Sequence, residues 1–523
     1  MRAERSRRLL EVAAALLLGG AYGSCFGHPR WGGGALLLLA LFVALVWRDA
    51  GAAPRPRALR GARLGLAFGV GAFTAGVWWL YISMAVYGGM PPALAAGAVV
   101  LFAAYLALYT AASTALAAAL APPATRAPWP LLRAASAAFA LAGAWTLGEL
   151  ARGTVFTGFP WLALGYAQSG DTLAGFAPLL GMYGVTFAAA LAAALLAALT
   201  QVSVRGAAAC VALLLALVGG ARLAGRVSWT QPTGAPLSVA LLQGDVGQSE
   251  KFQPENLTPT LALYGHWLGQ LRADLIVTPE TALPVLPADL PPGWLDGLQR
   301  SLRARGAHAL LGIPLTRGAE QYTNSVLGLG DAARYRYDKA HLVPFGEFIP
   351  WGFHWFVRMM NMPLGDFARG GFEQPSFDVD GARVAPTICY EDLFGEQLAQ
   401  RFRDPAAAPG IIANLTNLAW FGNTVVLGQH LEIARMRSQE FQLPTIRATN
   451  TGATAIIDAD GRVRQMLAPY TVGVLSGVVQ ARRGVTPFAW AAARLGYAPQ
   501  LLLCLLALAP AVLRRRRAAA STS

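Results

Sequence analysis

Long apolar stretches separated by short polar connections fill the first 225 residues of the chain, and one more occurs near its end. A helix that crosses a bilayer needs roughly 20 mostly apolar residues. The candidate stretches lie near 9–27, 33–47, 64–87, 92–120, 132–151, 174–200, 206–225 and 496–513. The pattern therefore predicts a polytopic α-helical membrane protein with eight spans.

A different pattern occupies residues 229–484. Short apolar runs rich in β-branched residues are bounded there by Gly, Pro, Asp or Asn, which is typical of buried strands. The runs are 238–246, 273–280, 308–315, 383–391 and 410–417, and helical stretches such as 256–272 and 427–442 lie between them. We expect an inserted α/β domain at 229–484, a membrane domain of seven helices at 1–228, and a final span with a basic tail at 485–523.

Composition and charge agree with this division. Hydrophobic residues make up 55% of the 523 residues and charged residues only 13%, which is too apolar for an ordinary soluble protein. The net charge of +14 comes largely from short Arg clusters in alternate connections. The positive-inside rule then predicts cytoplasmic termini and an outward-facing 229–484. No basic helix interleaved with aromatic residues occurs, so the charge does not indicate nucleic-acid binding.

Three residues with catalytic potential follow predicted strands. Glu280 follows "LIVTP", Lys339 follows "RYRYD" and Cys389 follows "APTI". Side chains at the strand ends of an α/β sheet face a crevice, and a cysteine nucleophile needs a nearby base or cation. Glu280 could take the thiol proton, and Lys339 could stabilise an oxyanion. Each residue also has an ordinary alternative: a helix cap, a surface cation and a small core residue, respectively.

Lysine is rare in this chain. Of the 42 basic residues only Lys251 and Lys339 are lysine, which suggests positions that need a compact ammonium group rather than a planar guanidinium. The sequence contains no GxGxxG, P-loop or HExxH motif, and Cys389 has no partner at CxxC spacing. We therefore expect neither a cofactor nor a metal.

Several longer motifs carry a resemblance to a known family. "TPETALP", "YDKAHLVPFGEFIP" and "ICYEDLF" resemble, in that order, the Glu–Lys–Cys signatures of the nitrilase superfamily. With "NLAWFGNT", "QHLEIARMRSQE", "RATNTGATA" and the apolar stretches, nearly the whole chain is similar to the apolipoprotein N-acyltransferases, the membrane-embedded members of that superfamily.

The resemblance implies a fold and a set of roles. The fold would be a nitrilase-like αββα sandwich in the periplasm of a Gram-negative bacterium, inserted between spans in the inner membrane. Cys389 would be the nucleophile, Glu280 the proton acceptor and Lys339 the oxyanion stabiliser. Three further residues would support the site, namely Glu347, Tyr390 and Glu391.

Two positions depart from the family pattern. Phe252 stands where the family usually has Trp, and Leu418 stands where it usually has Asp. The first departure would alter acyl-chain or substrate packing, and the second would loosen a loop near the site. Phe252 and Trp420 are the substrate-binding residues that the resemblance implies.

The implied reaction is a two-step acyl transfer. A phospholipid, typically phosphatidylethanolamine, would give its sn-1 acyl chain to Cys389, and the α-amine of a diacylglyceryl-cysteine at the N-terminus of an apolipoprotein would take it from there. We expect a monomer. The alternatives are a membrane-tethered nitrilase-type amidase or hydrolase and a scaffold with an inactive nitrilase domain. Residues 348–367, rich in aromatics and methionines, could form a membrane-facing lid or an ordinary buried helix.

Overall fold

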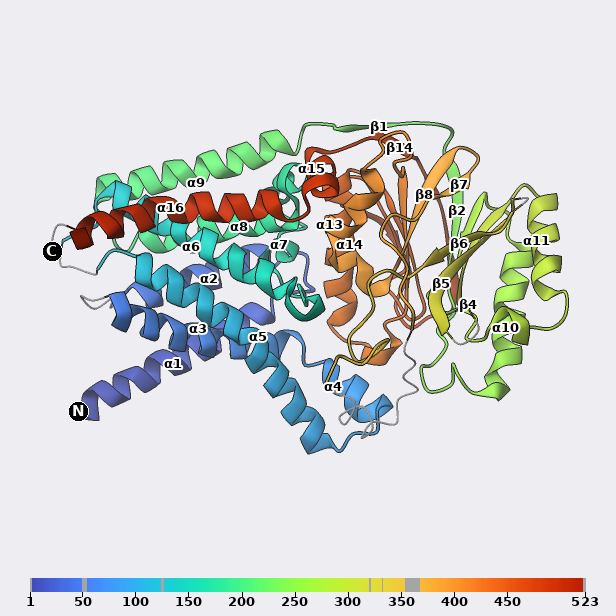
Figure 1. The fold of residues 1–523 in the computed structure, drawn as a ribbon, viewed down its shortest axis with the longest axis horizontal. Helices are drawn as coiled ribbons and strands as arrows, with labels where there is room; N and C mark the ends of the chain where they lie inside the picture. The colour runs from blue at the N-terminus through green and yellow to red at the C-terminus, as the bar shows by residue number, and fades with distance from the viewer. Residues whose placement is uncertain are drawn as a thin grey trace. The chain divides into compact units, whose positions relative to one another are not determined.

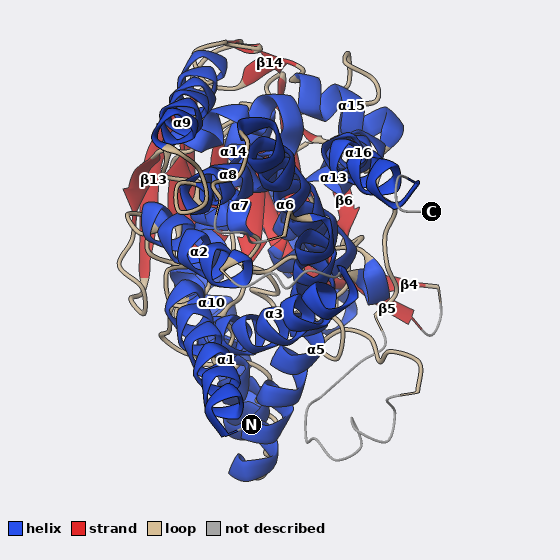
Figure 2. Cartoon of the chain, turned by 90° about the vertical axis from the view of Figure 1, so that its left-hand side faces the viewer, coloured by secondary structure: helices blue, strands red, loops and turns tan. Residues whose placement is uncertain are grey.

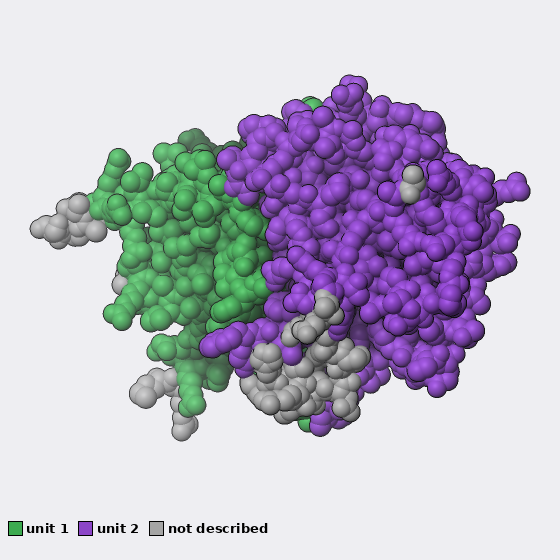
Figure 3. All heavy atoms as spheres, turned by 45° about the vertical axis from the view of Figure 1, so that its right-hand side comes forward, with its two compact units in different colours: residues 1–78, 93–227, 497–523 green, residues 79–92, 228–496 purple. Residues whose placement is uncertain are grey.

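The structure, a computed structural model, describes residues 2–48, 54–123, 127–318, 321–331, 333–352 and 367–520. Most of the candidate lid at 348–367 lies outside these residues. The chain forms two compact units (Figure 3). Unit 1 comprises residues 1–78, 93–227 and 497–523, and unit 2 comprises residues 79–92 and 228–496.

Unit 1 is built from helices, and each predicted apolar stretch contains one (Figure 1). The long helices are α1 (Arg2–Gly23), α2 (Gly32–Trp47), α3 (Pro54–Gly76), α5 (Pro92–Leu120), α6 (Leu131–Arg152), α8 (Ala177–Ala198), α9 (Val204–Ala224) and α16 (Ala498–Ala520). Among the described residues, five helices are long and apolar enough to cross a membrane, or six if one bent pair counts as a single span. The number of eight spans stays a prediction.

The predicted span 64–87 is the bent pair. Helix α3 ends at Gly76, and the chain resumes as α4 (Leu80–Ile82) and a short π-helix, η1 (Ser83–Tyr87). Residues 79–92 belong to unit 2, where the Trp79 indole N–H donates to Oε1 of Gln429 at 3.0 Å. Hydropathy does not reveal this break because residues on both sides of it are apolar.

Small residues let two helices of unit 1 pack backbone to backbone. A Cβ atom at Gly19 of α1 would lie 1.9 Å from the carbonyl oxygen of Phe68 in α3, and one at Gly71 of α3 would lie 2.1 Å from that of Leu16. Helices α1 and α3 lie side by side (Figure 2). Glycine at such crossings permits the close approach by which apolar helices associate.

A buried carboxylate organises the end of α6. Glu149 accepts hydrogen bonds from the Trp145 indole at 3.0 Å, the Leu164 backbone N–H at 3.0 Å and the Thr186 hydroxyl at 2.9 Å. Arg152 donates to the Phe159 carbonyl at 2.6 Å. Because buried polar groups need partners, this network fixes the loop between α6 and α7 (Leu164–Ala167).

Within its described residues, unit 2 contains two six-stranded sheets and a small two-stranded one. The first sheet has the order β13 (Gly473–Val479), β2 (Leu237–Gln243), β3 (Leu275–Val277), β4 (His308–Arg317), β5 (Gln321–Leu329) and β6 (Tyr335–Asp338). The second has the order β12 (Val463–Met466), β11 (Ala455–Ile457), β10 (Thr445–Thr449), β9 (Ile411–Thr416), β8 (Ala382–Ile388) and β7 (Phe377–Val379). Strands β1 (Thr230–Pro232) and β14 (Arg482–Gly484) form the small sheet.

The two large sheets face each other across one apolar core. Side chains from both sheets share a single buried cluster, including Val239 and Val277 from the first and Val384 and Ile411 from the second. Helices α10 (Pro254–Gln270) and α11 (Trp294–Ala304) cover the outer face of the first sheet, and α14 (Val426–Phe441) and α15 (Pro487–Leu495) cover that of the second (Figure 1). The central strands β3, β9 and β10 are buried along their whole length because both faces of their sheets are covered.

Candidate active site

Three chain segments bring the predicted catalytic residues to the edge between the sheets. Glu280 lies three residues after β3, Lys339 directly follows β6, and Cys389 directly follows β8 and begins a 3-10 turn, η5 (Cys389–Leu393). The strands β3 and β4 run parallel, as do β8 and β9. Parallel strands present their carboxyl ends at the same edge of a sheet, which is where α/β folds place their sites.

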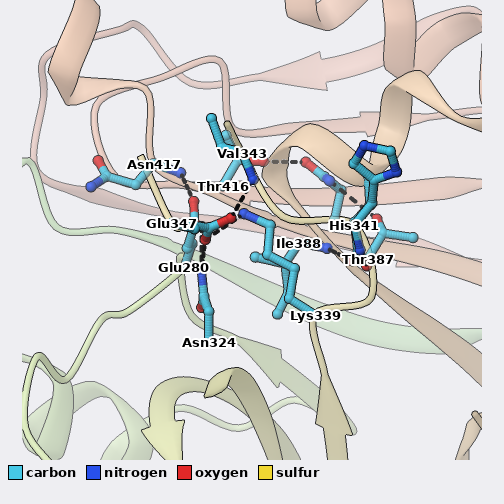
Figure 4. Close-up of polar contacts among 12 residues, drawn as sticks. Glu280, Asn324, Lys339, His341, Val343, Glu347, Thr387, Ile388, Thr416 and Asn417 are labelled. Carbon is cyan, nitrogen blue, oxygen red and sulfur yellow. Dashed lines mark hydrogen bonds and ion pairs between the residues drawn. The ribbon is translucent and has the colours of Figure 1, made fainter. Parts of the chain in front are cut away.

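Lys339 is held between two carboxylates (Figure 4). Its ammonium group is fully buried and lies 3.2 Å from Oε1 of Glu280 and 2.8 Å from Oε1 of Glu347. Burial by itself would lower the pKa of Lys339, but the charges of Glu280 and Glu347 outweigh burial and raise it above the ordinary lysine value. Lys339 therefore remains an ammonium group at physiological pH, as an oxyanion stabiliser must.

Two asparagines complete the hydrogen bonds of the carboxylates. The Asn324 side-chain amide donates to Oε1 of Glu280 at 2.8 Å and to Oε1 of Glu347 at 2.7 Å. The Asn417 backbone N–H donates to Oε2 of Glu280 at 2.9 Å. Glu280 is thus fixed from both sides, and Glu347 also accepts the Val343 backbone N–H at 2.8 Å (Figure 4).

Cys389 is half-buried beside these groups. Burial and the Glu280 charge raise the pKa of its thiol, while Lys339 opposes them. Its φ of 52° lies in the left-handed region, which non-glycine residues rarely adopt and which is over-represented at functional sites. A raised thiol pKa means that the thiolate forms only when a base takes the proton, and Glu280 is near enough for its charge to act on the thiol.

Glu391 joins the lysine segment to the cysteine segment. Its carboxylate accepts the Tyr337 hydroxyl at 2.8 Å, the Ala340 backbone N–H at 2.6 Å and the Ile388 backbone N–H at 2.7 Å. Through these bonds Glu391 holds the backbone that follows Lys339 and the backbone that precedes Cys389. Tyr390 is buried, with its ring centroid 5.3 Å from that of Phe394.

The two residues implied to bind substrate lie on turns of unit 2. Phe252 is 52% exposed on the turn before α10. Trp420 lies in the 3-10 turn η7 (Ala419–Phe421), with its ring centroid 5.8 Å from that of Tyr87. Leu418, where the family usually has Asp, is buried at the start of this turn.

The sequence did not identify four residues that the structure places here. Two of them are Asn324 and Asn417. Asn324 lies inside an apolar strand, and a polar residue in such a pattern is a signal that could have identified it. Gln248 and Lys251 lie on the segment after β2, and Lys251 donates to the Glu280 carbonyl at 3.1 Å. The scarcity of lysine singled out Lys251 but did not place it in the site. In the described part of the chain, no three His, Cys, Asp or Glu side chains group as metal ligands would.

Comparisons with known proteins cover both units. A family model described as "Apolipoprotein N-acyltransferase N-terminal domain" matches residues 18–195, and one described as "Carbon-nitrogen hydrolase" matches residues 227–486. An amidase of known structure from Nesterenkonia is 18% identical, covers 49% of this chain and 93% of its own, and superimposes with a TM-score of 0.34, a likeness too distant to carry weight.

Two curated relatives match almost end to end, and both are named apolipoprotein N-acyltransferase. The protein from Ralstonia nicotianae is 47% identical over 514 residues, which are 97% of this chain and 94% of that protein. The protein from Verminephrobacter eiseniae is 46% identical over 510 residues, 92% of each chain. The chain therefore belongs to the apolipoprotein N-acyltransferase family, and its α/β unit is a carbon-nitrogen hydrolase domain.

Proposed function

We propose that this protein is a phospholipid-dependent N-acyltransferase that completes the maturation of lipoproteins. It moves the sn-1 acyl chain of a phospholipid such as phosphatidylethanolamine through a Cys389 thioester to the α-amine of an S-diacylglyceryl-cysteine. The observation that carries this proposal is the cluster of Glu280, Lys339 and Cys389 at one edge of the sheets, in a chain of this family.

In the first step Cys389 takes the acyl chain. The Glu280 carboxylate accepts the thiol proton, and the sulfur attacks the ester carbonyl carbon. The carbonyl electron pair moves onto oxygen, where the Lys339 ammonium stabilises it. When the oxyanion collapses, the carbon–oxygen bond to glycerol breaks, the alkoxide takes the proton from Glu280, and a lysophospholipid leaves a thioester behind.

In the second step the acceptor amine discharges the thioester. The neutral amine attacks the thioester carbonyl, Glu280 accepts a proton from the attacking nitrogen, and Lys339 again stabilises the oxyanion. The carbon–sulfur bond then breaks, and the Cys389 sulfur regains the proton from Glu280. The product is an amide, and the kinetics are ping-pong because the first product leaves before the second substrate reacts.

The proposal includes the membrane arrangement. Residues 1–228 and 485–523 form eight spans in the inner membrane of a Gram-negative bacterium, both termini lie in the cytoplasm, and residues 229–484 work in the periplasm. The alternating Arg clusters and the apolar helices support this arrangement. Both substrates are lipid-anchored, so a monomer in the membrane meets them by lateral diffusion, without a cofactor or metal.

The test is the intact mass of detergent-solubilised protein after incubation with phosphatidylethanolamine and no acceptor. We expect an acyl-sized adduct that hydroxylamine removes. The adduct should be absent from Cys389→Ala and present in the control Cys210→Ala, in which a cysteine of helix α9 is replaced. A diacylated lipopeptide should then discharge the adduct to a triacylated product. Release of free fatty acid with no transfer to the lipopeptide would instead identify a hydrolase, and a folded protein without any adduct would refute the mechanism.

A further inference from the structure

The segment between β2 and α10 carries two buried polar side chains that the proposed mechanism does not use. Lys251 is 4% exposed and Gln248 is 5% exposed, whereas the neighbouring Phe252 is 52% exposed. Lys251 is one of only two lysines in the chain, and the other is Lys339. The segment thus turns its cation inward and its aromatic ring outward.

Both side chains are fixed against the proposed general base. The Lys251 ammonium group donates to the backbone carbonyl of Glu280 at 3.1 Å. The Gln248 carbonyl oxygen accepts the Asn417 side-chain amide at 2.9 Å, and the Asn417 backbone N–H holds the Glu280 carboxylate. The charge of Cys389 also raises the pKa of Lys251, so the ammonium group lies within electrostatic range of the proposed nucleophile.

The segment has more hydrogen-bond donors than acceptors. An ammonium group has three N–H donors, and the bond to Glu280 is the one that Lys251 makes within the described chain. The amide nitrogen of Gln248 is buried and makes no hydrogen bond to any described residue. Buried donors without acceptors are costly, and proteins keep them mainly where a ligand or water completes them.

Among the described residues, the positive charge of Lys251 has no carboxylate partner of the kind that Lys339 has. Lys339 forms ion pairs with Glu280 and Glu347, but Lys251 forms none with the residues that the structure describes. Burial lowers the pKa of Lys251 to about 8, against the opposing charges of Glu280 and Cys389, so the ammonium form predominates at neutral pH. A ligand that suits this place accepts hydrogen bonds and carries negative charge.

We propose that Lys251 and Gln248 form a binding site for the phosphodiester group of the acyl donor. The inference rests on the proposed function. The phosphodiester is attached to the same glycerol unit as the sn-1 ester, so it lies near Cys389 when that ester is attacked. The site therefore distinguishes phospholipids from uncharged glycerolipids.

The first test compares two acyl donors that share the sn-1 ester, phosphatidylglycerol and the uncharged diacylglycerol. The acylation efficiency of full-length protein is measured for each donor by intact mass, and their ratio is the readout. Lys251→Met should lower this ratio by about tenfold or more, because charge-assisted hydrogen bonds to the phosphodiester are lost. Gln248→Glu should lower it too, because the new carboxylate repels the phosphodiester and pairs with Lys251. Gln253→Met, an exposed substitution on the same segment, should leave it unchanged.

The ratio separates ligand binding from a general defect. If Lys251 acted only on Glu280 or on the Cys389 thiol, Lys251→Met would slow both donors equally and the ratio would stay constant. That result, or no effect on either donor, would overturn the proposed site.

A second measurement does not depend on turnover. Binding of short-chain phosphatidylglycerol to full-length Cys389→Ala protein is followed by calorimetry, with and without the added Lys251→Met change. We expect about tenfold weaker binding in the double variant, and equal binding would contradict the site. If wild-type protein formed no acyl adduct while Lys251-dependent binding persisted, the proposed function would fail and the phosphodiester site would stand.

Discussion

The two lysines of this chain show how strongly a local environment sets the chemistry of one residue type. Both ammonium groups are buried, yet carboxylates raise the pKa of Lys339, whereas burial lowers the pKa of Lys251 to about 8. The difference is that Glu280 and Glu347 touch the first ammonium group and a neutral carbonyl touches the second. The folded protein thus stabilises the charge of Lys339 and destabilises that of Lys251.

Because burying the Lys251 charge costs free energy, removing that charge should stabilise the folded protein. The pKa of Lys251 is lower in the folded protein than in the unfolded chain, so between pH 8 and about 10.5 the unfolded chain binds more protons and the wild type becomes more stable as pH rises. Below pH 8 the folded protein bears the full free-energy cost of burying the Lys251 charge. Lys251→Met should therefore raise the free energy of unfolding at pH 7 by about 1–3 kcal/mol.

The measurement is thermal unfolding of wild type and Lys251→Met at pH 7 and pH 9.5. The advantage of the variant should shrink at the higher pH. A variant less stable than wild type at pH 7 would mean that the bond to the Glu280 carbonyl outweighs the cost of burying the charge.

Removing one of the carboxylates beside Lys339 should impair catalysis more than folding. In Glu347→Gln the Lys339 ammonium loses one of its two ion-pair partners, so Glu280 alone pairs with it and is less free to take the thiol proton. We expect acyl-enzyme formation to slow by about 100-fold. The rate is followed by intact mass, with Glu373→Gln, an exposed partner of Arg403, as the matched control. Equal rates in both variants would remove Glu347 from the site.

At the scale of elements, Glu391 connects β6 and β8 near their carboxyl ends. One carboxylate accepts three backbone N–H groups, from Ala340, His341 and Ile388. Replacing it by glutamine puts an amide N–H₂ opposite backbone donors. Glu391→Gln should therefore destabilise unit 2 by about 1–3 kcal/mol.

Hydrogen exchange can locate this effect. The amides of Ala340 and Ile388 should exchange faster in Glu391→Gln, while those in α10, on the outer face of the first sheet, should change little. Uniformly faster exchange would indicate global destabilisation rather than loss of one connection.

For the molecule as a whole, the units do not coincide with a simple insertion of one domain into another. Residues 79–92 lie between two helices of unit 1 in sequence but belong to unit 2. The Trp79 ring centroid lies 4.6 Å from that of Phe421, and the ring of Tyr87 packs on Trp420. The turn η7, which these rings contact, begins two residues after Asn417, whose backbone N–H donates to Glu280.

A chain of residues 228–496 alone should consequently lack part of its own fold. We expect it to expose Phe421 and Gln429, to exchange the amides of 419–421 faster than the full-length protein does, and to form little acyl-enzyme. Hydrogen exchange and intact mass check both expectations. Native-like protection of 419–421 in the isolated segment would show that residues 79–92 are dispensable.

Much of this organisation follows from sequence patterns that are local. A strand repeats every 2 residues and a helix every 3.6, so apolar runs predicted the helices of unit 1, the strands β2, β3, β4, β8 and β9, and the helices α10 and α14. Motif order and the family resemblance pointed to Glu280, Lys339 and Cys389. Residue chemistry alone left each of them with an ordinary structural alternative.

Other features depend on residues far apart in sequence, and only the tertiary structure decided them. Glu280 and Asn417 are 137 positions apart, and the hydrogen bond between them exists because two separate sheets meet at one edge. Other contacts between distant residues bury Lys251, bring Asn324 to Glu280 and give residues 79–92 to unit 2. Apolar periodicity records which side of an element is buried but not which partner buries it, so the residues that set charge and hydrogen bonding at the site became visible only in the fold.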